Sequence, residues 1–119
     1  MKDEQGIRDN SLYILDEHGE VQPCPDVLAW GRWMEANRLT RHVAEDYDEG
    51  DGEKQVRVST VFLGLDHNHW GGQPILWETM VFGGALDGEQ QRYASRDAAV
   101  RGHQAICRRV NETIQRSHE

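Results

Sequence analysis

The sequence has few of the features that mark secreted or membrane proteins. It contains only two cysteines, Cys24 and Cys107, and they form no CxxC pair. A disulfide framework is therefore not expected, and two reduced thiols are typical of a cytoplasmic protein. No apolar run approaches the roughly 18–20 residues of a membrane span. The polar stretch 1–6 lacks the apolar core of a signal peptide. We therefore expect a cytoplasmic location with no membrane association.

Basic residues are also scarce. The 119 residues include 13 Lys and Arg against 21 Asp and Glu, for a net charge of -8. Binding to duplex DNA or to an anionic membrane needs a basic surface, so the composition argues against both. The charge is uneven: it is -7 over 1–60, -4 over 61–91 and +3 over 92–119. An acidic body with a basic C-terminal segment is the result.

The hydrophobic pattern predicts one α+β domain spanning 1–119. We expect a small antiparallel sheet of four to five strands, with a long C-terminal helix packed on one face and a shorter N-terminal helix. The expected strands are 12–15, 21–22, one opening at 42–44, 56–65, 75–82 and 91–94. The short helix is expected to begin near Cys24 or Pro25, with Val27, Trp30 and Met34 on its apolar face. The long helix is expected to follow the N-cap Ser95 and to run over about 96–116, with an apolar stripe from Ala99 to Ile114.

Two segments are predicted to lie outside the packed core. Residues 1–11 look like a flexible polar lead. Residues 45–54 contain six acidic side chains and two glycines, which is typical of a solvated acidic loop. This loop resembles a calcium-binding loop in composition, but its ligand spacing does not fit one.

The connection after the strand 56–65 is the segment most suggestive of a site. The candidate ligand-binding residues are Asp66, His67, Trp70, Glu78 and His103. Histidine and carboxylate side chains are metal ligands and general acids or bases, so a divalent metal held by His67, His69 and Asp66 is one interpretation. The alternative is structural: Glu78 and His103 would satisfy each other or the backbone, and Asp66 and His67 would cap a turn.

The outer face of the C-terminal helix carries a second candidate surface. Five arginines are expected there: Arg96, Arg101, Arg108, Arg109 and Arg116. Such a face can bind phosphate or an acidic partner. It can equally be a solvated face that the protein's own acidic loop neutralises.

Several short motifs resemble one family of proteins. They are VSTVFLGLDH at 58–67, ETMVFGG at 78–84, Arg-Tyr at 92–93 and Gly-His at 102–103. Together they are similar to small uncharacterised proteins of bacteriophages and prophages. The resemblance covers about 56–110 and implies a phage-derived protein of the host bacterial cytoplasm. It carries Asp66, His67, Glu78 and His103 as motif positions without giving them a role.

Three functions remain open at this point. The leading hypothesis is a non-enzymatic accessory protein that binds and modulates or inhibits a host or defence component, either a protein or a small ligand. The second is a metal-assisted or acid–base hydrolase with a site around His67, Glu78 and His103. The third is a virion or assembly component that acts by self-association through an apolar patch containing Trp70 and Trp77.

Overall fold

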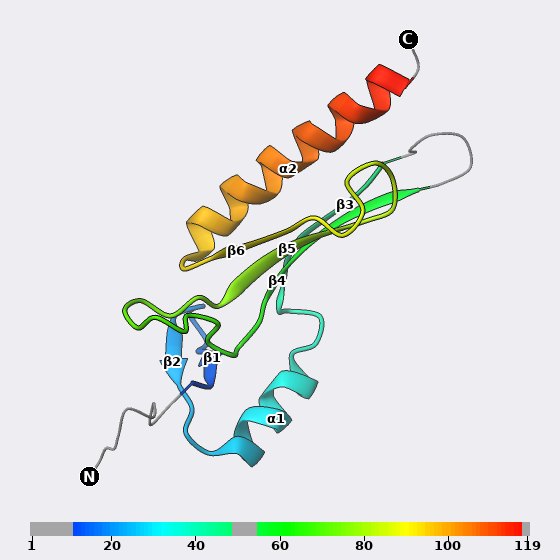
Figure 1. Cartoon of the computed structure of the whole chain (residues 1–119). Coiled ribbons are helices and arrows are strands. Elements are labelled where there is room, and N and C mark those ends of the chain that lie inside the picture. The colour runs from blue at the N-terminus through cyan, green and yellow to red at the C-terminus, as the bar shows by residue number, and fades with distance from the viewer. Residues whose placement is uncertain (1–10, 49–54, 118–119) are drawn as a thin grey trace.

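A computed structural model describes residues 11–48 and 55–117 of the chain and shows an α+β fold (Figure 1). Its main sheet has four antiparallel strands in the order β3-β4-β5-β6. The strands are β3 (His42–Asp48), β4 (Val56–Phe62), β5 (Trp77–Phe82) and β6 (Gln90–Tyr93). The long helix α2 (Arg96–Ser117) packs against this sheet. The predicted antiparallel sheet with a long C-terminal helix is therefore confirmed.

The N-terminal part forms a smaller unit. Two strands, β1 (Tyr13–Leu15) and β2 (Val21–Pro23), pair as a separate hairpin, and α1 (Val27–Ala36) contacts β1. Figure 1 shows this unit beyond the end of the main sheet that lies farthest from the C-terminus. None of the described helices is both long enough and apolar enough to cross a membrane.

Alternation along the strands builds the core between the sheet and α2. Side chains at every second position of a strand share a face. Two apolar clusters result. One contains Val56, Val58, Val81, Ile106 and Val110, and the other contains Phe62, Leu76, Trp77 and Ala99. Thr60, Thr79 and His103 are buried in the same interface. On β4 and α2 these polar residues come between members of the two clusters in the sequence, so polar groups interrupt the apolar core.

The shorter helix begins at Val27, slightly after the expected boundary at Cys24 or Pro25. Asp26 is its N-cap, because its side chain accepts hydrogen bonds from the backbone N–H groups of Leu28 and Ala29. The helix is joined to its surroundings by Trp30, whose Nε1 donates to the carbonyl oxygens of Tyr13 and Gly64. The expected apolar face was wrong at its first position, since the side chain of Val27 is exposed.

The acidic stretch 45–54 is not entirely a loop. Strand β3 runs to Asp48, and residues 45–48 pair with β4 in regular antiparallel register. The prediction of a loop over 45–48 was therefore wrong. Pairing with the buried strand β4 outweighs the low strand propensity of acidic residues. The rest of the predicted loop, 49–54, and residues 1–10 of the predicted lead lie outside the described residues.

Candidate functional site

His103 is the central residue of the buried polar group. It lies on the sheet-facing side of α2, and only 3% of its surface is exposed. Its Nδ1 lies 2.7 Å from Oγ1 of Thr60, and its Nε2 lies 2.7 Å from Oδ2 of Asp46. Both ring nitrogens are therefore hydrogen bonded, as a buried imidazole requires. Strand β4 supplies one partner and the edge strand β3 supplies the other.

The hydrogen bonds continue across the sheet to Tyr93. The Tyr93 hydroxyl donates to Oγ1 of Thr79 at 3.1 Å, and the Thr79 and Thr60 hydroxyls are hydrogen bonded to each other. The two threonines face one another because the register of β4 and β5 pairs them. One assignment of protons satisfies every group. Each hydroxyl donates toward His103 Nδ1, and the Nε2–H of the neutral imidazole donates to the Asp46 carboxylate.

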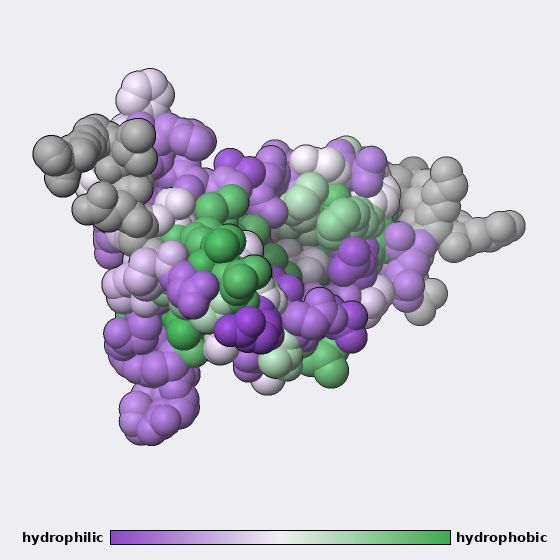
Figure 2. Space-filling view, turned by 90° about the horizontal axis from the view of Figure 1, so that it is seen from below, coloured by the Kyte–Doolittle hydropathy of each residue, from purple (hydrophilic) through white to green (hydrophobic). Residues whose placement is uncertain are grey.

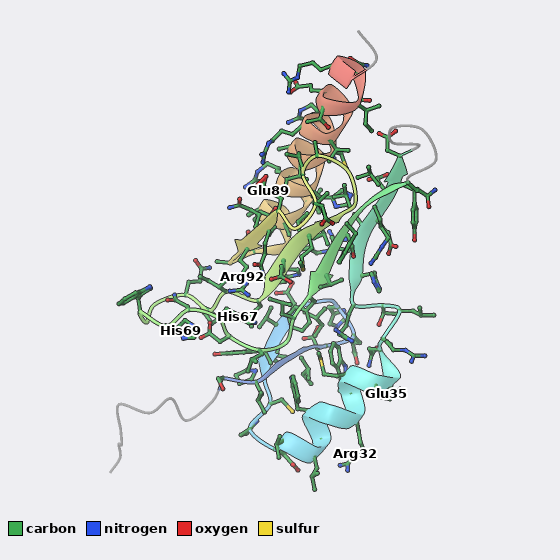
Figure 3. The ribbon with its side chains drawn as sticks, turned by 45° about the vertical axis from the view of Figure 1, so that its right-hand side comes forward. Arg32, Glu35, His67, His69, Glu89 and Arg92 are labelled. Atoms are coloured by element: carbon green, nitrogen blue, oxygen red, sulfur yellow. The ribbon has the colours of Figure 1, made fainter. Side chains whose placement is uncertain are left out.

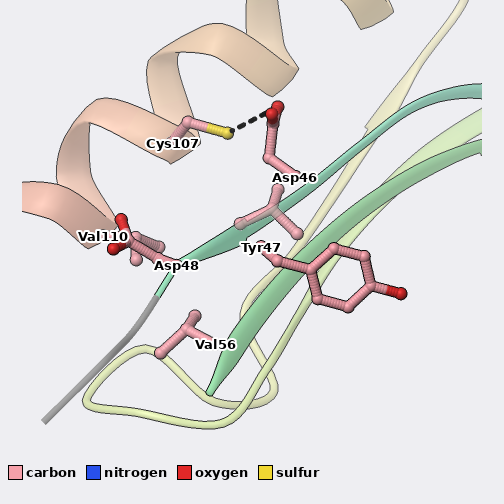
Figure 4. A pocket seen from close by; sticks show the side chains of 7 residues that line it. Asp46, Tyr47, Asp48, Val56, Cys107 and Val110 are labelled. Carbon is pink, nitrogen blue, oxygen red and sulfur yellow. Dashed lines mark hydrogen bonds between the residues drawn. The ribbon is translucent and has the colours of Figure 1, made fainter.

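Cys107 completes the group on the other side of Asp46. Its Sγ donates to Oδ2 of Asp46 at 3.5 Å (Figure 4). His103 and Cys107 are four residues apart on α2, so they share one face of the helix. The hydrogen bond to His103 lowers the pKa of Asp46. Burial, with the nearby carboxylates of Asp46 and Asp48, raises the pKa of the Cys107 thiol to about 12.

A pocket of about 220 Å³ opens beside Asp46 and Cys107. Its lining consists of Asp46, Tyr47, Asp48, Val56, Val58, Cys107 and Val110. Figure 4 shows the carboxylates and the thiol near the two valines that it labels. Sites for drug-sized ligands and cofactors usually measure about 300–1,000 Å³. This pocket is therefore better suited to an ion with its water, or to one side chain, than to a nucleotide.

The arrangement does not support nucleophilic catalysis by Cys107. A nucleophilic cysteine needs a thiolate and a base in hydrogen-bond contact with it. Here the Asp46 carboxylate accepts hydrogen bonds from both the thiol and the imidazole. The raised pKa keeps Cys107 protonated at neutral pH. The trio of Asp46, His103 and Cys107 can hold a proton or a cation, but it does not activate the Cys107 thiol as a nucleophile.

Glu78 and His103, proposed from the sequence as partners, lie on opposite faces of the sheet. Thr79 is joined through Thr60 to His103 under α2, so its neighbour Glu78 points the other way. The Glu78 carboxylate instead accepts hydrogen bonds from Gln90 and from Arg92, the latter at 3.0 Å. The structural pairing expected for Glu78 and His103 is therefore not formed.

His67 lies on the Glu78 side of the sheet. Burial is the main cause that lowers its pKa, and the positive charge of Arg92 lowers it further while Glu78 opposes both. Figure 3 shows His67 near Arg92, with His69 farther along the loop. Asp66 organises this loop, because its Oδ1 accepts hydrogen bonds from the N–H groups of Asn68 and Ile75. The structure thus brings His67 near Glu78 and separates both from His103.

The remaining candidates are not gathered into one site. Trp70 is 94% exposed at the tip of the loop, whereas Trp77 is buried in the core, so the two tryptophans do not form one apolar patch. Among the described residues, only Asp46, His103 and Cys107 bring three potential metal ligands within 4.8 Å of one another. His67, His69 and Asp66 do not form such a group.

Sequence reasoning missed Asp46, Cys107, Thr60 and Thr79 as members of the site. Asp46 was assigned to the acidic loop, and each cysteine was considered alone. A signal was present in the spacing, because His103 and Cys107 are four residues apart in a helical stripe. Two threonines at inward positions of apolar strands were a second signal, since buried hydroxyls need partners.

Comparisons with known proteins add no residue to this site. No family model, no curated protein and no solved structure matches the chain. The resemblance to phage and prophage proteins stays a prediction from the motifs.

Proposed function

We propose that this chain is a non-enzymatic accessory protein that docks on a basic partner protein and thereby modulates or inhibits it. The docking surface in this proposal is the outer side of α1. The observation that carries it is the exposure of two large apolar side chains at the start of this helix, Val27 at 60% and Leu28 at 70%. None of the ten described residues of α1 is fully buried.

The outer side of α1 combines apolar and charged groups. Leu28, Arg32 and Glu35 follow one another at helical spacing and are all exposed. Figure 3 shows Arg32 and Glu35 projecting from α1, and Figure 2 shows apolar side chains exposed among hydrophilic ones on this side of the molecule. Apolar anchors surrounded by charged residues are the usual composition of a protein–protein interface.

The charge around α1 indicates the nature of the partner. Residues 11–48 contain eight acidic and three basic side chains, for a net charge of -5. Opposite charge speeds association and suppresses wrong partners. A protein with a basic surface, such as one that itself binds nucleic acid, fits this charge. The proposed setting is the cytoplasm of a bacterial host.

The site geometry supports a binding function over the hydrolase alternative. The residues assigned to the hydrolase, His67, Glu78 and His103, lie on two faces of the sheet, so they do not converge on one substrate. Assembly through a patch of Trp70 and Trp77 loses its basis, because Trp77 is buried. Docking through the exposed side of α1 depends neither on a converged catalytic site nor on a tryptophan patch.

Site-specific photo-cross-linking tests this proposal. A photoreactive amino acid is placed at Arg32 on the outer side of α1, and, as a control, at Trp70 on the exposed loop. Each protein is irradiated in bacterial extract at low and high salt. We expect a discrete adduct from position 32 only, with a basic partner, which is lost at high salt.

A matched pair of variants completes the experiment. The double variant Val27→Asp, Leu28→Asp should abolish the adduct, and Trp70→Ser should leave it unchanged. All substituted side chains are exposed, so both variants are expected to keep the wild-type circular dichroism spectrum. Equal adducts from positions 32 and 70, or an acidic partner, would overturn the proposal.

A further inference from the structure

We propose that Asp46, His103 and Cys107 form a binding site for a zinc-class divalent metal ion, with a coordination position open to the adjoining pocket. This inference concerns the interface between α2 and the sheet. It is independent of the docking surface on α1, and either proposal can fail without the other.

The ligand geometry is the first support. Zinc binds imidazole nitrogen and carboxylate oxygen at about 2.0–2.2 Å and thiolate sulfur at about 2.3 Å, so its ligand atoms lie roughly 3–4 Å apart. Here Asp46 Oδ2 is 2.7 Å from His103 Nε2 and 3.5 Å from Cys107 Sγ. All three ligand atoms lie within 4.8 Å of one another. Small side-chain movements are enough to place them around one ion.

The surroundings of His103 provide the second support. A metal-binding histidine usually donates its other N–H to a fixed acceptor, which sets the ring orientation. Thr60 Oγ1 lies 2.7 Å from Nδ1 and occupies that position. When Nε2 binds a metal ion, Nδ1 must carry the proton and donate it to Thr60. Thr60 can then donate to Thr79, because a hydroxyl both donates and accepts.

The two hydroxyls of Thr60 and Thr79, the hydroxyl pair, therefore serve both the metal-free and the metal-bound form of the site. Without metal, the hydrogen bonds run from Tyr93 through Thr79 and Thr60 to His103 Nδ1. With metal, they run in the opposite direction and end on the Tyr93 hydroxyl oxygen, so the His103 Nδ1–H and both threonine hydroxyls keep hydrogen-bond partners. Valine at either threonine position has a similar shape but carries no hydroxyl, so it would support neither direction.

The ligand set determines the class of metal. A thiolate and an imidazole favour zinc and similar ions, whereas magnesium and calcium prefer oxygen ligands alone. Two anionic ligands, the carboxylate and the thiolate, balance the charge of a divalent ion. Binding replaces the proton on Cys107 sulfur with the metal, and that proton passes to the buffer. Three protein ligands leave a fourth position, and the pocket of about 220 Å³ beside Asp46 and Cys107 has room for a water there.

Titration of untagged, chelator-treated protein with Co²⁺ tests the site. Cobalt is a spectroscopic substitute for zinc, and its bond to a thiolate gives a charge-transfer absorption band in the near ultraviolet. We expect this band to saturate at one equivalent of Co²⁺ and to disappear when Zn²⁺ is added. Chelator-treated wild-type protein with no saturable band would overturn the proposal.

Three variants assign the ligands. Cys107→Ser should lose the band, and the matched control Cys24→Ser should keep it, because Cys24 lies outside the trio. Thr60→Val should keep the band but weaken cobalt affinity by about 10- to 100-fold, as loss of a partner to a metal-binding histidine usually does. A band that survives in Cys107→Ser and vanishes in Cys24→Ser would refute the assignment. Unchanged affinity in Thr60→Val would refute the role of the hydroxyl pair.

Discussion

Replacing Gly102 by alanine is expected to destabilise the protein, although the same change inside a helix normally stabilises. Gly102 lies in α2 against the side chain of Tyr93 on β6. A Cβ atom built at this position meets the Tyr93 ring and hydroxyl well inside van der Waals contact. The ring must move, and the hydrogen bond from its hydroxyl to Thr79 is then disturbed. The substitution therefore acts on the same hydroxyl chain that reaches His103.

The expected magnitude follows from two opposing terms. Alanine is favoured over glycine in a helix interior by about 0.8–1.0 kcal/mol. Overpacking of a closely packed site costs about 1–3 kcal/mol. Gly31 in α1 offers the matched control, because a Cβ there meets nothing within 4 Å. Gly31→Ala should therefore raise the free energy of unfolding by about 0.8–1.0 kcal/mol. The free energy of unfolding of Gly102→Ala should lie roughly 1–3 kcal/mol below that of Gly31→Ala.

Urea unfolding followed by circular dichroism measures both variants. A third measurement isolates the cause, since Gly102→Ala can be made in a Tyr93→Ala background. Without the ring, the alanine should become stabilising, as it is at Gly31. If Gly102→Ala stabilises the wild-type protein as much as Gly31→Ala does, the close packing of α2 on Tyr93 is refuted.

Three further predictions concern titratable groups of the metal-free protein. The thiol pKa of about 12, against an ordinary 9.0, should slow alkylation of Cys107 by at least about tenfold relative to urea-unfolded protein, because the smaller thiolate fraction outweighs the higher nucleophilicity of a more basic thiolate. Equal rates in mass-spectrometric time courses would contradict this. Because His103 lowers the pKa of Asp46, the stability that this carboxylate contributes is present above about pH 4 and is lost as the pH falls. Asp46→Asn should thus be less stable than wild type at pH 7. The difference should be less than about 1 kcal/mol, because the Asp46 side chain is 65% exposed. The urea unfolding midpoints of the two proteins should converge at acidic pH. Arg92→Met should raise the pKa of His67 in an NMR titration, since Arg92 holds it down, and a fall would show that the two groups do not interact as described.

The sequence predicted the elements of the fold well, because its periodicities are strong. Val56, Val58, Thr60 and Phe62 share a face of β4 as their alternation indicated, and the stripe beginning at Ala99 packs on the sheet. Ser95 caps α2 as expected, since its Oγ accepts from the N–H of Ala98. These features depend on local spacing, which the sequence displays directly.

The site was harder to predict because it depends on which strands pair and in what register. The polar groups of β5 belong to two different surfaces, since Glu78 and Thr79 are adjacent and point in opposite directions. Asp46 joins His103 across 57 positions of sequence, and only the antiparallel pairing of β3 with β4 brings it there. The local sequence pattern does not predict such a long-range contact.

The facing threonines of β4 and β5 also have a consequence for how the chain avoids misfolding. A shift of β5 by one residue would reverse the direction of every side chain on it. The carboxylate of Glu78 would then enter the apolar space below α2, and the indole of Trp77 would lose its contact with Phe62. Burying an unpartnered carboxylate is far more costly than losing one hydrogen bond. The Thr60–Thr79 hydrogen bond adds to this selection, because the two hydroxyls face each other only in the native register.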